Sequence, residues 1–516
     1  NLLDISGIPL FTSQRDETHP LVVAGGHATY NPEPMHAFID AFVIGEGEEA
    51  ISDIIDAYQV WKSADLSRQD LLESLASING IYVPSLYETE YHADGTLSAV
   101  RSRTESAPLP VVKRILPVLP PPPTKLVVPF VDTVHNRIPI EIMRGCTRGC
   151  RFCHAGMVTR PVRERSVEEI VSAIEDGVAH TGFEEIGLLS LSSSDYTHIL
   201  ELVNAVKERF VGRHLSISLP SLRIESVSVD LMDAIMSERR SGFTLAPEAA
   251  TERMRQIINK PVSTQQVLDT AREVYSRGWP TLKLYFMIGH PSETLEDVQA
   301  IVDLCKAVLK EGRKVIGGRA KLHAGVSTFV PKPHTPFQWV PCDTEENITA
   351  KQTLLKQQLR GKGLKLTWTQ PEETMVEAWL SRGDRRMAEV IYEAWRRGAK
   401  FDAWKDQLNY TAWQEAFSAV GLDPGFYTHR ERAVTENLPW DHIRTTVRKS
   451  FLVQDLDRSQ DGETLEDCRD NCYACGILPA YADVRRQITG EAWGCPEVSP
   501  RGKKPELIQV ALPQQD

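Results

Sequence analysis

Long apolar runs and an excess of positive charge are both missing from this chain of 516 residues. No apolar stretch approaches the roughly 18 residues that a membrane-spanning helix needs, so the sequence predicts no contact with a membrane. The formal net charge is −12, so any nucleic-acid partner would have to bind a local basic patch. Hydrophobic residues make up 41% and charged residues 25%, which is typical of globular proteins.

Cysteine is scarce as well, and its distribution argues against a disulfide framework. Seven of the nine cysteines fall into two tight groups, within residues 146–153 and 468–495. Such grouping is typical of metal binding in a reducing compartment, so we expect a cytoplasmic protein. The chain begins with Asn1 inside an apolar segment, which indicates a fragment of a longer protein.

The first cysteine group has the spacing C-x3-C-x2-C and consists of Cys146, Cys150 and Cys153, just after a strand-like run at residues 137–143. Thiolates are soft ligands that suit iron–sulfur clusters or zinc. Three cysteines on one short loop can bind three irons of a four-iron cubane, which leaves the fourth iron open to a small molecule.

Two other interpretations fit the same residues. The three cysteines and His154 would make a structural zinc site with three thiolates and one imidazole. Residues 150–154 also match the C-x-x-C-H pattern of haem attachment, which requires an exported protein.

Strand and helix patterns alternate from about residue 126 to residue 345, which indicates an α/β domain with parallel strands. Six strands are expected, at residues 137–143, 186–191, 215–220, 242–245, 281–288 and 321–329. The cysteines follow the C-terminal end of the first strand, the end at which barrel active sites lie.

The cysteine loop, with Phe152 before its third cysteine, resembles the signature of the radical S-adenosylmethionine (radical SAM) superfamily. The resemblance implies a partial (β/α)6 barrel whose cysteines hold a [4Fe–4S] cluster, with S-adenosylmethionine (SAM) on the open iron. An electron from the cluster would cleave SAM to a 5′-deoxyadenosyl radical that attacks a substrate. The resemblance also implies a reductase or flavodoxin-type electron donor, and SAM contacts from Phe152, Ser192, Asp195, Ser218, Glu248 and Gly289.

Six arginines crowd the cysteine loop: Arg144, Arg148, Arg151, Arg160, Arg163 and Arg165. We expect them mainly to offset the negative charge of a thiolate-ligated cluster. A clamp for a substrate phosphate is the alternative.

Residues 1–60 have the pattern of the end of a doubly wound α/β domain. A buried strand ends at Gly25-Gly26, and a second strand, Ala41–Ile44, runs into Gly45-Glu46-Gly47-Glu48. This run resembles the last portion of the cobalamin-binding domain that precedes many radical SAM cores, so the full-length protein is a candidate for cobalamin binding. The cobalt-ligating D-x-H-x-x-G motif of that domain is absent. Residues 61–125 form a connector with a proline-rich linker.

The last two parts of the chain are a helical region at 346–450, whose tryptophans are expected to form its core, and a cysteine-rich tail at 451–516. In the tail, Cys468, Cys472 and Cys475 repeat the C-x3-C-x2-C spacing, and Cys495 follows. Four thiolates fit either an auxiliary iron–sulfur cluster or a structural zinc.

Together these features predict a radical SAM enzyme. Its substrate is unidentified and could be RNA, a peptide or a small molecule. Its reaction could be methyl transfer, methylthiolation or a rearrangement. The alternative is a zinc-stabilised RNA-binding or interaction protein without radical chemistry.

Overall fold

Parallel strands position the cysteine loop in the computed structural model, which describes residues 1–131, 133–213, 215–219, 222–226, 229–234, 242–488 and 493–495. Three of them form a sheet in the order β11-β10-β7, and four form another in the order β12-β13-β14-β15. The strands are β7 (Ile138–Glu141), β10 (Glu185–Leu189), β11 (Ser216–Ser218), β12 (Phe243–Glu248), β13 (Thr281–Ile288), β14 (Lys321–Thr328) and β15 (Leu364–Trp368). The predicted α/β class, with its six β/α units, is confirmed.

The arrangement differs from the expected sheet in two respects. Among the described residues β11 and β12 do not pair, so the strands form two parallel sheets instead of one continuous sheet. Pro220, in the expected third strand, lies outside the described residues. Strand β15 comes from the region expected to be helical and pairs in parallel with β14, from Leu322 opposite Leu364 to Val326 opposite Trp368.

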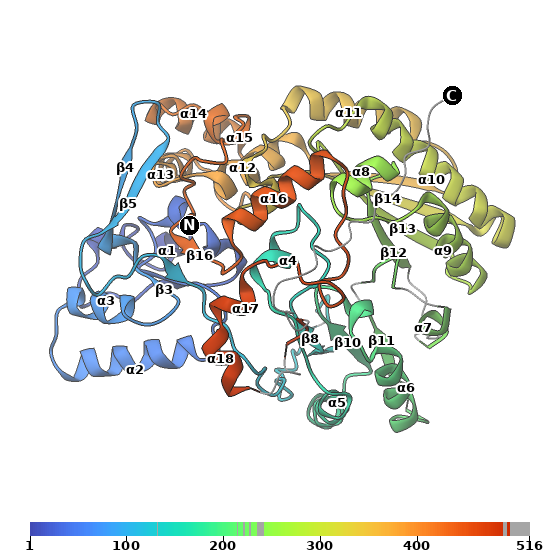
Figure 1. Cartoon of the computed structure of the whole chain (residues 1–516), viewed down its shortest axis with the longest axis horizontal. Helices are drawn as coiled ribbons and strands as arrows, with labels where there is room; N and C mark the ends of the chain where they lie inside the picture. Colours follow the sequence, from blue (N-terminus) through green and yellow to red (C-terminus); the bar gives the residue numbers. More distant parts are fainter. Residues whose placement is uncertain are drawn as a thin grey trace, which may run out of the picture.

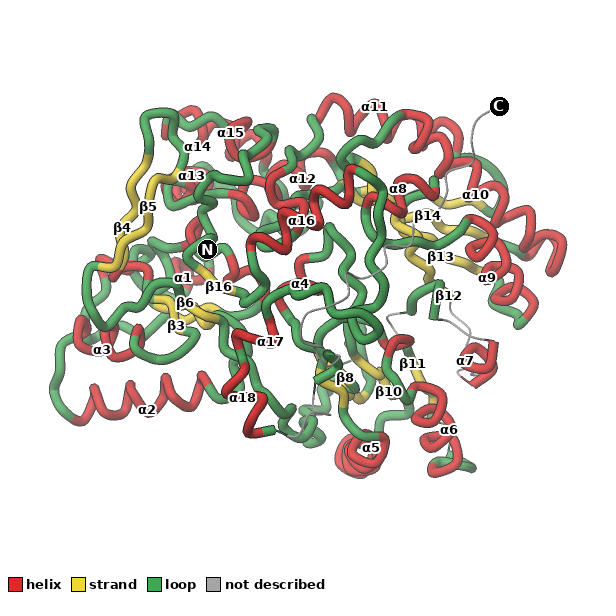
Figure 2. The backbone as a smooth tube through the Cα atoms, in the orientation of Figure 1, coloured by secondary structure: helices red, strands yellow, loops and turns green. Residues whose placement is uncertain are grey.

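Amphipathic helices cover the outer faces of both sheets (Figures 1 and 2). They are α5 (Val167–Thr181) and α6 (Ile199–Arg209) on the first sheet, and α9 (Thr264–Ser276), α10 (Leu295–Ile316) and α11 (Glu345–Gln358) on the second. Side-chain caps set where they begin. The Ser166 hydroxyl accepts the N–H of Glu169 at the start of α5, and Thr294 and Asp297 form a capping box on α10.

The N-terminal part is a small sheet covered by two helices, α2 (Ala50–Ser63) and α3 (Arg68–Ala76). Strands β1 (Val23–Ala24) and β2 (Ala41–Val43) pair in parallel, and β3 (Ile81–Tyr82) pairs antiparallel with β2. The sheet therefore extends past residue 60, where we placed the end of this domain, into the expected connector. A hairpin of β4 (Tyr87–Tyr91) and β5 (Leu97–Ser102) follows.

The Gly45–Glu48 run joins this N-terminal sheet to the rest of the chain. Gly45 has a φ of 104°, and a Cβ there would lie 2.1 Å from the Arg114 carbonyl oxygen, so only glycine fits. The Glu46 carboxylate accepts hydrogen bonds from Arg163 at 2.6 and 2.8 Å. The run that resembles the edge of a cobalamin domain thus packs against the linker and the segment that follows the cysteine loop.

The helical region consists mainly of α12 (Pro371–Arg382), α13 (Met387–Arg396), α14 (Tyr410–Val420) and α15 (Pro424–Thr428). Trp379 stacks on Tyr410 with ring centroids 5.6 Å apart and meets Phe417 edge-on at 4.8 Å, so tryptophan does form the core there. Trp404 is an exception and is 67% exposed.

The C-terminal segment crosses the middle of the molecule, between the N-terminal part and the two parallel sheets (Figure 1). It contains α16 (Lys449–Gln460), α17 (Ile477–Ala480) and α18 (Ala482–Gln487). Residues 496–516 of the expected tail lie outside the described residues. Across the part of the chain that the structure describes, no helix combines the length and apolar character needed to cross a membrane.

Candidate metal centre

The first cysteine loop lies beyond the C-terminal end of β7, between β8 (Met143–Arg144) and α4 (His154–Val158). Cys150 is buried, and Cys146 and Cys153 are partly exposed. Gly145 has a φ of 94°, and a Cβ there would lie 2.8 Å from the Pro161 carbonyl oxygen. The turn into the loop therefore requires glycine.

The three thiols of this loop lie close enough to influence one another. Burial and, next, the neighbouring Cys150 raise the pKa of Cys153 to about 12, and the same two causes raise the pKa of Cys146. Nη1 of Arg223 lies 3.5 Å from Cys150 Sγ, and the Gly156 N–H donates to Cys153 Sγ at 3.3 Å. Three soft ligands with a cation and a hydrogen-bond donor fit a [4Fe–4S] cluster, which would hold them as thiolates.

Arg151 and Asn259 hold the backbone of the loop in place. Arg151 is fully buried and forms a salt bridge of 3.0 Å with Asp455 on α16. The Asn259 side-chain amide donates to the carbonyl oxygens of Arg148 and Gly149, at 3.2 and 3.0 Å. The shape of the loop thus depends on residues far from it in the sequence.

The expectation that the surrounding arginines offset a cluster's charge does not hold for five of the six, which are paired with carboxylates. The pairs are Arg144 with Glu48, Arg148 with Asp195, Arg151 with Asp455, Arg163 with Glu46 and Arg165 with Glu169. Arg160 differs from the others, since burial alone would lower its pKa but the nearby Cys475 and Cys468 raise it. Its guanidinium lies among the second group of cysteines.

Glu248 ends β12 and faces the first cysteine group. It has a φ of 63°, an unusual conformation for a residue other than glycine, and such strain is frequent at functional sites. Lys260 Nζ lies 3.0 Å from its carboxylate. Glu248 also contributes to the raised pKa of Cys153, so its carboxylate lies within electrostatic range of that thiol.

Ser192 and Asp195 follow β10 and are both buried. The Ser192 hydroxyl donates to the Asp195 carboxylate at 2.6 Å, and Arg148 of the cysteine loop binds the same carboxylate. Burial would raise the pKa of Asp195, but Arg148 holds it below its usual value. These side chains therefore link the end of β10 to the cysteine loop.

The remaining expected SAM contacts occupy three different places. Ser218 ends β11 opposite Gly187 of β10. Gly289 follows β13 with a φ of 84°, and its N–H donates to Glu293 at 2.6 Å. Phe152 packs against a buried cluster that includes Phe329.

His154, the fourth ligand of the zinc interpretation, forms no metal-ligand group with the three thiols among the described residues. Its ring meets Tyr30 edge-on at 5.8 Å and His27 at 6.4 Å, both in the N-terminal part. Burial lowers the pKa of His154 to about 3, so the ring is neutral. These contacts favour a centre with three cysteine ligands.

Sequence reasoning missed Arg223, Asn259 and Lys260 as parts of this site. None of them belongs to a motif. Arg223 comes shortly after β11, and a basic residue past the end of a parallel strand was the one available signal. Asn259 and Lys260 follow α8 (Glu252–Ile257), whose position depends on tertiary packing.

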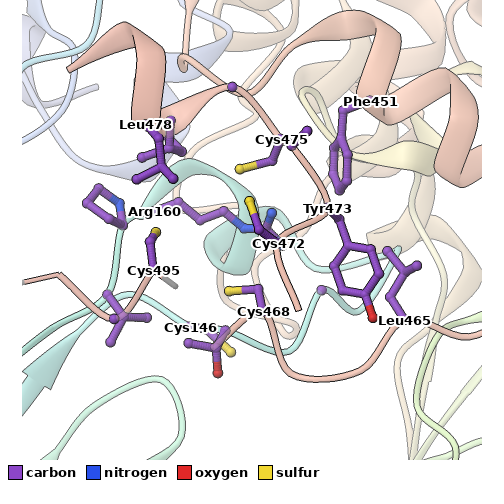
Figure 3. A pocket seen from close by; sticks show the side chains of 18 of the residues that line it. Cys146, Arg160, Phe451, Leu465, Cys468, Cys472, Tyr473, Cys475, Leu478 and Cys495 are labelled. Carbon is purple, nitrogen blue, oxygen red and sulfur yellow. The ribbon is translucent and has the colours of Figure 1, made fainter. Parts of the chain in front are cut away.

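The second group of cysteines lines a cavity of about 500 Å³ against the first loop. Figure 3 shows Cys468, Cys472, Cys475 and Cys495 around the Arg160 side chain, with Cys146 at the lower edge. Among the described residues, no three His, Cys, Asp or Glu side chains are grouped closely enough for a single metal ion. The four sulfurs of the second group therefore line the cavity and are not gathered around the position of a single metal ion.

Two family models match the chain. The model described as "Radical SAM proteins, N-terminal" covers residues 1–84, and "Radical SAM superfamily" covers residues 140–305. The chain therefore contains a radical SAM domain, preceded by the N-terminal domain of radical SAM proteins. The resemblance inferred from the cysteine loop is confirmed.

Several curated proteins are similar to parts of the chain. The uncharacterized protein MJ0966 of Methanocaldococcus jannaschii is 32% identical over 49% of this chain and 53% of its own length. The uncharacterized methyltransferase PH0819 of Pyrococcus horikoshii is 25% identical over 55% of this chain and 57% of its own. The ribosomal protein uS12 methylthiotransferase RimO of Thermodesulfovibrio yellowstonii is 26% identical over 33% and 41%. The chain thus spans about half the length of the first two.

Among solved structures, the radical SAM methyltransferase TsrM of Kitasatospora setae, with cobalamin and a [4Fe–4S] cluster bound, aligns with a TM-score of 0.43. Its sequence identity is 16%, over 61% of this chain and 58% of that one.

Proposed function

We propose that the protein is a radical SAM enzyme in which Cys146, Cys150 and Cys153 hold a [4Fe–4S] cluster. When bound, the cluster supplies one electron that breaks the C5′–S bond of SAM, giving methionine and a 5′-deoxyadenosyl radical that abstracts hydrogen from the substrate. One observation carries the proposal. Three mutually close thiols lie at the C-terminal edge of a parallel sheet, inside the matched radical SAM domain.

The surrounding residues bind and shield SAM in this proposal. Glu248 would accept hydrogen bonds from SAM hydroxyl or amino groups, and Lys260 fixes the orientation of its carboxylate. Arg223 would compensate the charge of the Cys150 thiolate, since its Nη1 lies 3.5 Å from that sulfur. Phe152 and the buried Phe329 would keep water from the reacting atoms.

Release of 5′-deoxyadenosine tests the proposal directly. Protein purified without oxygen and reduced with dithionite should release it from SAM, and Cys150→Ala should abolish the release. Cys305→Ala is the matched control, because Cys305 is buried within α10 and belongs to neither cysteine group. Full activity of Cys150→Ala would contradict the proposal.

For the reaction, we propose transfer of a methyl or methylthio group. The support comes from relatives whose names describe a methyltransferase and a methylthiotransferase. Both reactions convert one SAM to S-adenosylhomocysteine, whereas a rearrangement does not. Incubation with RNA, peptide and small-molecule fractions, with both SAM products measured, would identify the substrate class. Formation of 5′-deoxyadenosine alone would favour a rearrangement.

Three further expectations complete the proposal. A reductase or flavodoxin-type protein would supply the electron, and the cytoplasm would be the compartment. Cobalamin is a further candidate cofactor, and corrin absorbance after growth with cobalamin tests this. The Arg114 backbone packs so closely against Gly45 that only glycine fits there. This packing accounts for the first glycine of the Gly45–Glu48 run without cobalamin.

A further inference from the structure

The C-terminal cysteine segment is bound directly to the loop that carries the first cysteines. The Cys468 N–H donates to the Thr147 carbonyl oxygen at 3.1 Å, and the Thr147 hydroxyl donates to Asp467 at 2.8 Å. Near the end of the described chain, the Gly494 N–H donates to the Val162 carbonyl oxygen at 3.1 Å. These bonds bring Cys468 and Cys495 to the lining of one cavity, where Figure 3 shows both near Arg160.

The backbone on both sides of Cys475, the third cysteine of this group, has an unusual conformation. Ala474 has a φ of 53°, and Gly476 has a φ of 113°. A Cβ at Gly476 would lie 2.6 Å from Arg448 Cγ and 2.7 Å from the Thr446 carbonyl oxygen. The Arg448 N–H in turn donates to the Cys475 carbonyl oxygen at 2.8 Å. Such a strained and tightly anchored turn is typical of a loop that presents ligands.

Arg160 supplies an independent indication that an anion belongs in the cavity. Its side chain is 6% exposed and lies among the cysteines. Its Nε donates to the Gly156 carbonyl oxygen at 3.3 Å, and its guanidinium carbon lies 5.7 Å from the centroid of the Phe451 ring. Within the described residues no carboxylate forms a salt bridge with it. Burial of a cation without a negative partner is costly. A thiolate-ligated metal centre is negatively charged and would provide that partner.

The spacing of the four thiols favours an iron–sulfur cluster over a single zinc ion. A single zinc ion holds its thiolates at about 2.3 Å, so the four sulfurs must converge on one point. Here the four thiols line the cavity together with many other side chains, and no three of them are grouped for one ion within the described chain. A cubane is several ångströms across and keeps its four cysteine sulfurs much farther apart.

We propose that Cys468, Cys472, Cys475 and Cys495 hold a second [4Fe–4S] cluster beside the first, with Arg160 as its neighbouring cation. With four protein thiolates this cluster is closed and does not bind SAM. The Thr147–Gly149 backbone forms a wall of its cavity, and Cys146 also lines that cavity.

Metal analysis of the full chain, prepared without oxygen and reconstituted with iron and sulfide, tests the proposal. About eight irons per chain and no zinc are expected, as two four-iron clusters require. The Cys472→Ser/Cys475→Ser variant should contain only about four irons per chain. It should still release 5′-deoxyadenosine from SAM, because the first centre is unchanged. The Cys150→Ser/Cys153→Ser variant should also keep about four irons but lose SAM cleavage. Cys305→Ala is again the control and should keep about eight.

Electron paramagnetic resonance of the reduced wild-type protein avoids reliance on variants that fail to fold. Two cluster signals are expected, and added SAM should change only one of them. Arg160→Gln should shift the midpoint potential of the signal that does not respond to SAM. About four irons with one zinc per chain, or a single cluster signal, would overturn the second cluster. If the wild-type protein holds about eight irons per chain but does not cleave SAM, only the proposed activity would be overturned, and the second cluster would stand.

Discussion

The buried ion pair between Arg151 and Asp455 is expected to hold the first cysteine loop against the C-terminal segment. Both side chains are fully buried, and Arg151 Nη2 lies 3.0 Å from the carboxylate. Arg151 also donates to the carbonyl oxygens of Gln256, Ile257 and Glu463, at 3.0, 2.9 and 2.6 Å. One guanidinium therefore joins the cysteine loop to α8 and to the end of α16.

Replacing Arg151 with methionine keeps the volume but leaves the Asp455 carboxylate and three carbonyl groups without their donor. Removing one member of a buried pair costs about 3–5 kcal/mol, because the remaining charge is buried without a partner. For a domain of about 150–250 residues, such as the radical SAM core, each kcal/mol shifts the Tm by about 2–4 °C. The apparent Tm should therefore fall by roughly 6–20 °C. The Arg151→Met/Asp455→Leu variant should regain much of that loss, because no charge is left uncompensated.

Thermal unfolding by circular dichroism, with hydrogen exchange measured by mass spectrometry, checks this reasoning. Exchange should increase in the cysteine loop and around residues 455–475, and α2 should be unaffected. The exposed pair of Arg486 and Asp483 offers a control, since Arg486→Met should change stability by less than about 0.5 kcal/mol. A Tm for Arg151→Met within 2 °C of the wild type, or a double variant less stable than both single variants, would refute it.

Two further predictions concern carboxylates. Glu248→Gln should weaken SAM binding about tenfold in anaerobic equilibrium dialysis with little change in Tm, whereas normal affinity with a large loss of Tm would make the residue structural. Burial opposes ionisation of Glu33, but His442 and then Arg385 lower its pKa from 4.5 to about 2. Because the folded-state pKa is lowered, Glu33 stabilises the fold above pH 4.5 by about 3 kcal/mol, and this contribution is lost between pH 4.5 and 2. The Tm difference between wild type and Glu33→Gln should therefore shrink over that range, and a constant difference would show that the charge has no role.

The six β/α units of the core could be predicted from the sequence because local signals define each of them. Ser166 and Thr294 cap helices at the expected positions, and the buried runs of β10 and β13 are long enough to recognise. Strand β15 was missed because its five residues stand alone between helices. Only its partner β14, more than thirty residues earlier, makes this segment a strand.

The cysteine ligands could be proposed from spacing alone, but their environment could not. Arg151 and Asp455 are 304 positions apart, and Arg223 is 73 positions from Cys150, so no local pattern records either contact. The arginine-rich segment illustrates the limit. Its composition suggested one electrostatic role, whereas tertiary structure gives most of its members a carboxylate partner.

The way these arginines are paired explains how the cysteine loop becomes the junction of the chain. Arg163 binds Glu46 of the N-terminal part, Arg151 binds Asp455 of the C-terminal segment, and Arg148 binds Asp195 at the end of β10. Each pair ties a different part of the molecule to the same twenty residues, and each neutralises a charge that the chain buries there. Arg160 alone is left facing thiols. Its guanidinium is buried beside Cys475 and Cys468, so the second cluster that we propose would supply the negative partner that the other arginines have in carboxylates.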